Sequence, residues 1–457
     1  MILCGLIACA LLLLIFLLTV PGLPEVTATN TSRAALRKQP LTFIFFCAIF
    51  SLPIGQLHAQ TLTVLHNFTG AQDGGRPFAG LTMDAAGNLY GAAADGGLES
   101  CTSHQGFGCG TAFMLSRRNN WTFNLLYTFQ GDNDGAYPIG GLTIGRDGRL
   151  YGTTAIGGGS GCGVGVLLGC GTVYKLRPPA RFCANVLCPW SETVLYRFPG
   201  AAAGFFPEDA VTFDSAGNLY GTTNQGSISN GGGVVFELTP SGSGWTETVL
   251  HEFTAIGPDG SLPVGGVTFD FQGNLYGTAS AGGTTQGGIV YQLVPAGSGP
   301  IFNPLYSFQF PNIIPYGGVI ADRAGNLYGT TLNGSGAGSV FELVANGGSW
   351  RYQLLYALPG SIGDWGPTAN LAMDAGGNLY GTTYNGGSSP NCNRGCGTIF
   401  KLTPSNGSGV YTLLHEFTGT EGVLPWGGVI IDANGDLYGT TTLGGTYNEG
   451  VVWKLTP

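Results

Sequence analysis

Short apolar runs that alternate with polar residues recur along most of the chain, and residues 211–223 show the pattern clearly. The run Val211-Thr212-Phe213 leads into Asp214, then a turn with Gly217 and Asn218, then a second run that carries Tyr220. This order is typical of two short antiparallel strands joined by a tight turn. We expect the Asp214 carboxylate to accept N–H bonds within the turn, Gly217 to supply positive φ, and Asn218 to tolerate left-handed geometry. The segment therefore predicts a hairpin and not a ligand site.

The hairpin occurs seven times, and its tyrosine marks each copy: Tyr90, Tyr151, Tyr220, Tyr276, Tyr328, Tyr380 and Tyr438. Each repeat holds four strand-like runs, which in the third copy are residues 210–214, 219–223, 233–238 and 246–253. A tyrosine that occurs seven times is expected to be a core residue, since a catalytic side chain need not be repeated. His66, His251 and His415 stand in the fourth run, where other copies have tyrosine, and we expect them to be packing residues of outer strands.

The two ends of the repeat region complement each other. An isolated fourth run, residues 61–68, precedes the first copy, and the last copy stops after its third run, residues 451–455. If the first strand completes the last blade, the chain forms a closed seven-bladed β-propeller with four antiparallel strands per blade, which leaves no exposed sheet edge. A solenoid is the alternative, but it would need polar caps at both ends.

The amino-acid composition of the chain limits the kinds of molecule that it could bind. The chain has 81 glycines, 9% charged residues and a formal net charge of −9. The glycines punctuate strands, and the negative charge argues against nucleic acid and anionic membrane surfaces while allowing a neutral or cationic partner. Sequence does not fix the oligomeric state, and we expect a monomer.

The first 59 residues have the pattern of an export region. Residues 2–20 are long enough to span a bilayer, whereas residues 41–54 have the length of a signal-peptide core and follow the cations Arg33, Arg37 and Lys38. We expect a leader at 1–32, a signal peptide at about 33–59, and a propeller at 60–457 that is secreted, periplasmic or at the cell surface, without stable membrane insertion after cleavage. A true membrane anchor at residues 2–20 is the alternative.

The cysteines agree with export. Eight of the 11 form close pairs in the repeat region, namely Cys101 with Cys109, Cys162 with Cys170, Cys183 with Cys188, and Cys392 with Cys396. Pairs at these spacings would close loops as disulfides, each contributing about 2–3 kcal/mol. A metal site at Cys392 and Cys396 is the alternative, but no second ligand pair lies near them in the sequence.

Three sequence units now allow a comparison with a known family. Gly-Asn-Leu-Tyr-Gly-Thr-Thr, Gly-Thr-Val-Tyr-Lys-Leu and Val-Leu-Tyr-Arg-Phe occur in order, and over residues 61–457 the chain resembles the GloVer-type tandem-repeat proteins of bacteria. The turn is more loosely similar to that of NHL-like propeller repeats. The resemblance implies an exported, propeller-shaped protein and brings no catalytic residues. Anchored members carry C-terminal surface anchors, and because this chain ends at Pro457 without one, we expect a released protein.

Candidate binding residues lie in the loops that lead from one repeat into the next. Each of these loops contains a proline at an equivalent position: Pro77, Pro138, Pro207, Pro263, Pro315, Pro367 or Pro425. In a propeller these loops share a face with the disulfide loops and surround the central channel, and function concentrates on such loops. Deviations from the common Pro-x-Gly-Gly pattern are informative. Phe78, Tyr316 and Trp426 place aromatic rings after the proline, while Glu208, Asp209 and Asn370 replace apolar or glycine residues.

Acidic residues precede several of these prolines, namely Asp73, Asp134, Asp259, Asp364 and Glu421. Aromatic faces beside carboxylates and amides suit sugar rings or a cation, and a divalent cation such as Ca²⁺ is compatible with them. The simpler interpretation makes the acidic residues solvated turn formers and leaves Phe78, Tyr316 and Trp426 as packing between blades. We hypothesise that the ligand-binding residues are Phe78, Asp134, Glu208, Asp209, Tyr316, Asn370 and Trp426.

The function that these residues favour is binding of carbohydrate or cell-envelope material. The alternative is a propeller enzyme of the polysaccharide lyase, glycosidase or lactonase type that uses Glu208, Asp209 and Asn370, and a third interpretation is a purely structural repeat protein. No G-x-S-x-G motif or zinc-type histidine pair occurs. An enzyme would need two or three groups that converge on one point, with a carboxylate in a perturbed environment.

Overall fold

A computed structural model describes residues 60–457 except 99, 102–106, 160, 161, 163–168, 180–189, 201, 202, 227–230, 243, 256, 298, 310–312, 333–337, 361–365 and 406. All described residues belong to the compact unit His58–Pro457. The expected leader and signal peptide, the Cys183 and Cys188 pair and Asp364 lie outside the described residues. Within the described part, no helix is long and apolar enough to cross a membrane.

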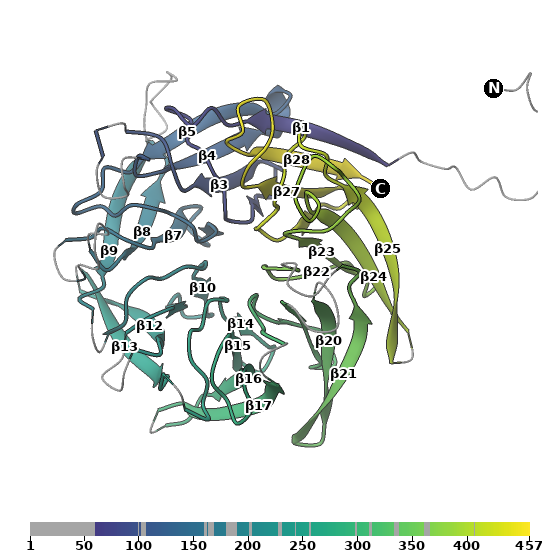
Figure 1. Cartoon of the computed structure of the whole chain (residues 1–457). Coiled ribbons are helices and arrows are strands. Elements are labelled where there is room, and N and C mark those ends of the chain that lie inside the picture. Colours follow the sequence, from purple (N-terminus) through teal and green to yellow (C-terminus); the bar gives the residue numbers. More distant parts are fainter. Residues whose placement is uncertain are drawn as a thin grey trace, which may run out of the picture. The chain divides into compact units, whose positions relative to one another are not determined.

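Seven four-stranded antiparallel sheets form a ring, so the protein is a seven-bladed β-propeller, as predicted (Figure 1). The innermost strands are β2 (Thr82–Met83), β6 (Thr143–Ile144), β10 (Thr212–Phe213), β14 (Thr268–Phe269), β18 (Ile320–Ala321), β22 (Ala372–Met373) and β26 (Ile430–Ile431). The second strands are β3 (Leu89–Ala93), β7 (Leu150–Thr154), β11 (Leu219–Thr223), β15 (Leu275–Ala279), β19 (Leu327–Thr331), β23 (Leu379–Thr383) and β27 (Leu437–Thr441). We number the blades from 1, which starts at β2, to 7, which starts at β26.

The outer half of each blade is a longer hairpin. The third strands are β4 (Thr111–Ser116), β8 (Thr172–Arg177), β12 (Val234–Ser241), β16 (Gln286–Val294), β20 (Ser339–Asn346), β24 (Thr398–Ser405) and β28 (Val451–Thr456). The fourth strands are β5 (Thr122–Thr128), β9 (Ser191–Arg197), β13 (Gly244–Glu252), β17 (Ile301–Gln309), β21 (Ser349–Ala357), β25 (Ser408–Glu416) and β1 (Thr61–Asn67). A short 3₁₀ turn, η1 (Arg117–Asn119), joins β4 to β5.

The ring closes in the predicted way, because the first strand of the propeller completes blade 7. β1 pairs antiparallel with β28, with Thr61 opposite Thr456 and Val64 opposite Trp453. The N-terminal strand therefore covers the edge that β28 would otherwise expose.

The inner hairpins confirm most of the predicted turn chemistry. Asp214 Oδ1 accepts the N–H groups of Gly217 (2.7 Å) and Asn218 (2.9 Å), and Gly217 has φ +93°. Asn218 differs from the prediction, since its φ is not positive; its side-chain amide donates to Asp214 Oδ2 at 2.9 Å. Asn218 thus closes the turn through its side chain and not through left-handed backbone.

The innermost strands are shorter than predicted, with two residues where the sequence pattern suggested about five. The residues before each strand run along the wall of the channel, where the backbones of neighbouring blades are in contact. A Cβ on Gly427, for example, would lie 2.7 Å from the Gly80 nitrogen. The proline loops are therefore held by packing, by hydroxyl groups and by isolated backbone bridges to the loop after the second strand, such as the one between Ala136 and Ile156.

Two contacts recur at the proline loops, the first at all seven and the second at six. The proline packs on the glycine before the third strand of the preceding blade, where a Cβ would lie 2.4–3.0 Å from the proline Cδ. The first threonine of Gly-Thr-Thr then donates its hydroxyl to a carbonyl in the next blade's loop, as Thr153 does to Asp209 (3.0 Å) and Thr440 to Ala79 (2.8 Å). These contacts explain why Pro, Gly and Thr recur together.

Rings stack between adjacent blades on the outer strands, which confirms that His66 and His251 are packing residues. His66 stacks on Phe123 with centroids 4.1 Å apart, and His251 on Phe302 at 3.7 Å. Tyrosine pairs occupy the equivalent places elsewhere, for example Tyr356 and Tyr411 at 4.8 Å.

Candidate functional site

Six of the seven predicted ligand-binding residues line one cavity at the end of the channel that the proline loops surround. The cavity has a volume of about 290 Å³, and we call it the channel mouth. Its lining includes Phe78 from blade 1, Glu208 and Asp209 from blade 3, Tyr316 from blade 5, Asn370 from blade 6 and Trp426 from blade 7. Side chains separated by more than 300 residues are thus brought together by ring closure.

One side of the channel mouth is aromatic. The Trp426 ring makes edge-on contacts with Phe78 (centroids 5.8 Å apart), Tyr316 (5.7 Å) and Tyr384 (5.3 Å). The Thr368 hydroxyl donates to the Trp426 carbonyl at 2.7 Å and fixes the loop beneath the indole. These rings pack between blades and also line the cavity, so the two interpretations drawn from the sequence coexist.

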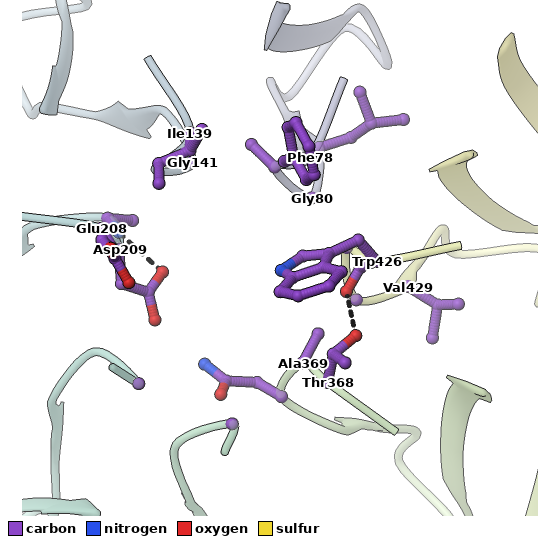
Figure 2. Close-up of a pocket in the computed structure, with 18 of the residues that line it drawn as sticks. Phe78, Gly80, Ile139, Gly141, Glu208, Asp209, Thr368, Ala369, Trp426 and Val429 are labelled. Atoms are coloured by element: carbon purple, nitrogen blue, oxygen red, sulfur yellow. Dashed lines mark hydrogen bonds between the residues drawn. The ribbon is translucent and has the colours of Figure 1, made fainter. Parts of the chain in front are cut away.

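The opposite side is acidic. Figure 2 shows the Glu208 and Asp209 carboxylates across the cavity from the Trp426 indole. Asp209 accepts N–H bonds from Ala210 (2.6 Å) and from Gly266 in blade 4. Burial raises the pKa of Asp209, and these two N–H groups oppose that rise. Asp209 therefore connects two blades and is held in one position.

Glu208 is the second carboxylate of the channel mouth. Burial raises its pKa, a hydrogen bond with Asn224 opposes the rise, and the charge of Asp209 adds to it. The pKa of Tyr137 is raised to about 12 by burial, then by the charges of Asp95 and Glu208. No Lys, Arg or His side chain is among the described residues that line the cavity, so the channel mouth favours neutral or cationic groups over anions.

Asn370, which lines the cavity, and Asp134, the seventh predicted residue, have different surroundings. The Asn370 side-chain oxygen accepts the N–H of Gly318 in blade 5, so Asn370 connects blades as Asp209 does. Asp134 does not line the cavity. It accepts the Tyr127 hydroxyl (2.8 Å) and the Gln130 N–H (3.1 Å). Asp73, Asp259 and Glu421 make comparable bonds at the ends of their outer strands.

Disulfides brace the loops that carry the channel mouth. Bonds join Cys101 to Cys109, Cys162 to Cys170, and Cys392 to Cys396. The Cys170 carbonyl accepts the Phe206 N–H (3.1 Å), directly before Pro207 and Glu208, and the Cys396 carbonyl accepts the Leu424 N–H (2.8 Å), directly before Pro425 and Trp426. In the described part of the chain, no three His, Cys, Asp or Glu side chains are grouped as metal ligands.

Sequence reasoning missed Tyr137, Asn224 and Tyr384. Tyr137 stands before the loop proline with φ +61°, and because Phe206, Leu262 and Leu424 share this left-handed geometry at the same place, it belongs to the repeat and does not mark a site. Asn224 and Tyr384 follow the Gly-Thr-Thr unit, at a position that varies between copies. The position has no common residue from which either departs, so the sequence offered no signal for them.

Comparisons with known proteins identify a family and a fold. A family model described as the Gloeobacter/Verrucomicrobia repeat matches residues 165–313 and 301–457. No curated protein is similar enough to count as a relative.

Solved structures that are similar include several propellers. One is an ulvan lyase of polysaccharide lyase family PL25 bound to -[GlcA(1-4)Rha3S]-, with 10% identity over 84% of this chain and 94% of that chain, and a TM-score of 0.47. A candidate 6-phosphogluconolactonase from Bacteroides uniformis has 15% identity over 72% of this chain and 84% of that chain, and a TM-score of 0.44. The extracellular domain of a candidate one-component system from B. thetaiotaomicron has 11% identity over 81% of this chain and 37% of that chain, and a TM-score of 0.45. Each TM-score lies below 0.5, so none of these likenesses bears on function.

Proposed function

The chain belongs to the Gloeobacter/Verrucomicrobia repeat family, and we propose that its propeller is an exported module that binds carbohydrate or cell-envelope material at the channel mouth. The observation that carries the proposal is the cavity that six predicted residues line together. The aromatic side supplies apolar faces for a sugar ring, and Glu208 and Asp209 supply acceptors for its hydroxyl groups.

Export is part of the proposal. The described disulfides are typical of oxidising compartments, and the predicted signal peptide precedes the propeller. A module in the periplasm or outside the cell would meet envelope polymers directly. We expect neutral or amine-bearing glycans to bind and polyanionic glycans not to bind, because carboxylates and no cations line the cavity.

The arrangement of the carboxylates favours a binding module over a glycosidase. Glycosidases place two carboxyl groups on either side of the scissile bond. Glu208 and Asp209 are instead adjacent on one side of the cavity, and Asp209 is engaged by two backbone N–H groups. Among the described residues that line the cavity, the glycosidase form of the enzyme alternative therefore lacks a second carboxylate on the opposite wall.

The test is isothermal titration calorimetry of the exported protein against neutral, amine-bearing and anionic oligosaccharides. Trp426→Ala should weaken binding at least about tenfold by removing the central ring of the aromatic side. Tyr447→Ala is the matched control, because Tyr447 is an exposed aromatic residue outside the cavity (58% exposed).

Each glycan that binds should then be incubated with the protein and its products analysed. Binding without turnover supports the module, and turnover that Glu208→Gln abolishes supports the enzyme. If no glycan binds, or if Trp426→Ala binds as tightly as the wild type, the proposal is wrong.

A further inference from the structure

A second cavity lies between blades 3 and 4, on the face of the ring opposite to the channel mouth. It has a volume of about 760 Å³ and is bordered by the inner turns of both blades and by the loop that joins β16 to β17. Its wall is mainly apolar and aromatic, with Phe213, Tyr220, Leu250, Phe269, Leu293 and Pro300. Ligand pockets are commonly 300–1,000 Å³ in volume and lined in this way.

The equivalent space at other blade junctions is occupied by a tryptophan of the chain itself. Trp121 contacts Tyr438 of the preceding blade (centroids 5.5 Å apart), Trp190 contacts Tyr90 (6.4 Å), and Trp350 contacts Tyr276 (6.1 Å). Trp245 of blade 3 shares a buried cluster with Tyr151 of blade 2. An indole ring of the chain thus occupies this space in four junctions.

Blade 4 has proline at the tryptophan position. Leu238 lies opposite Glu247 in blade 3, and Leu293 lies opposite Phe302 in blade 4. Two residues before these partners stand Trp245 and Pro300. The cavity therefore lies at a junction where the chain does not supply its own indole.

The exposed fractions of the hairpin tyrosines agree with the absence of a tryptophan between blades 3 and 4. Six of the seven, all but Tyr220, are buried at 8% exposure or less. Tyr220, which lines the cavity, is half-buried. Blades 6 and 7 also lack the tryptophan, with Gly409 and Gln60 in its place, but the tyrosines at those junctions, Tyr328 and Tyr380, are buried at 8% exposure.

The rim of the cavity adds a further ring and acceptors. Phe271 stands at the tip of the blade 4 turn and is 84% exposed, whereas other copies have Ala85, Arg146 or Ser215 at this place. Glu237 lines the cavity, and its Oε1 accepts the Tyr220 hydroxyl at 2.8 Å. An indole N–H is a donor that such a carboxylate accepts.

From these observations we propose that the space between blades 3 and 4 is a binding site for a planar aromatic ring of indole size, which takes the place of the missing tryptophan. Tyr220 and Phe269 would contact the ring, and Glu237 would accept its N–H group. The site is independent of the channel mouth, because the two cavities share no residue.

The probe for the test is 5-fluoroindole, followed by ¹⁹F NMR with the exported protein. A saturable change of the fluorine signal is expected. Pro300→Trp should weaken binding at least about tenfold, since the new side chain would occupy the cavity as Trp245 does in the neighbouring junction. Ile301→Trp is the matched control; Ile301 is the next residue and is 55% exposed, so an indole there should leave the affinity within about twofold.

A second blocking variant keeps the test decisive if Pro300→Trp does not fold. Thr248 is exposed, lines the cavity and lies in a strand that tolerates aromatic residues, so Thr248→Trp should also weaken binding about tenfold. Trp426→Ala should leave binding unchanged, which separates this site from the channel mouth. Absence of saturable binding up to the solubility limit of the probe, or wild-type affinity in a folded blocking variant, would overturn the proposal.

Discussion

The tyrosine of each inner hairpin serves both packing and hydrogen bonding. Its ring lies between two blades, and its hydroxyl lies 2.8–3.3 Å from a carboxylate oxygen of the turn aspartate in every blade. In blades 3 and 5 a glutamate, Glu237 or Glu342, lies closer and shares the proton. A buried hydroxyl without a partner would be costly, so the recurrence of Asp with Tyr has a physical reason. The sequence pattern identified the buried ring and did not reveal its hydroxyl partner.

Glu192 on β9 is a residue at which pH should change stability. Burial raises its pKa to about 7, the charge of Asp134 adds to this, and Arg197 opposes it. Because the folded state favours the protonated form, stability is lost as pH rises from about 4.5 to about 7. Glu192→Gln should therefore raise the free energy of unfolding by about 1–2 kcal/mol at pH 8 and leave it unchanged at pH 4. Urea denaturation at both pH values measures the difference.

Glu247 on β13 is the matched control, since it occupies the same place in the next blade and its Oε2 accepts the Tyr196 hydroxyl at 2.7 Å. Replacing this carboxylate by an amide weakens a charge-assisted bond, so Glu247→Gln should gain less stability at pH 8 than Glu192→Gln. Equal gains at pH 4 and pH 8 for Glu192→Gln would show that its ionisation is not the cause.

At the scale of elements, the threonine after each Tyr-Gly connects a second strand to the proline loop of the next blade. Six blades make this bond, with donors Thr153, Thr222, Thr278, Thr330, Thr382 and Thr440. Blade 1 has Ala92 instead, and this residue is buried with no hydroxyl to offer the Gly140 carbonyl. The contact between blades 1 and 2 therefore lacks a hydrogen bond that the other six blade contacts make.

Ala92→Thr should strengthen that contact. The repeat supplies the geometry, so the new hydroxyl should donate to the Gly140 carbonyl and raise the free energy of unfolding by about 0.5–1.5 kcal/mol. The reciprocal variant Thr440→Val keeps the shape, removes the bond to the Ala79 carbonyl, and should cost about 1–3 kcal/mol. Denaturation of both variants beside the wild type is the measurement, and a loss of stability in Ala92→Thr would mean that blade 1 has no room for the hydroxyl.

At the scale of the whole molecule, the fold could be predicted because its information is repeated. Seven copies of one hairpin and two complementary ends specify the ring. Where the sequence pattern of one strand is ambiguous, the equivalent strands of the other copies identify it. The site is encoded differently, by residues that break the pattern, and Phe78, Glu208 and Trp426 could be selected for that reason. Tyr384 and Asn224 come from loops of variable sequence, where no pattern exists to be broken. Asp134 was selected for its charge, but its position depends on Tyr127, which sequence spacing does not reveal.

Ring closure yields a prediction for the complete propeller. Deleting residues 60–68 removes β1 and leaves the β28 edge with unpaired N–H and C=O groups. The variant should unfold at a lower temperature than the wild type and self-associate, as measured by calorimetry and by size-exclusion chromatography with light scattering. Returning the same residues after Pro457 through a flexible linker should restore a monodisperse protein. A deletion variant that stays as stable as the wild type would show that the contact between β1 and β28 is dispensable.

The pairing of β1 with β28 also sets an order of events in time. β1 is the first strand of the propeller to be synthesised, and its partner β28 comes after every other strand. Six blades can each complete their sheets from neighbouring sequence, whereas the seventh must wait for the chain's two distant ends to meet. A molecule interrupted during synthesis would carry an unpaired β1, so the hydrogen bonds that close the ring can form only after β28 has been made.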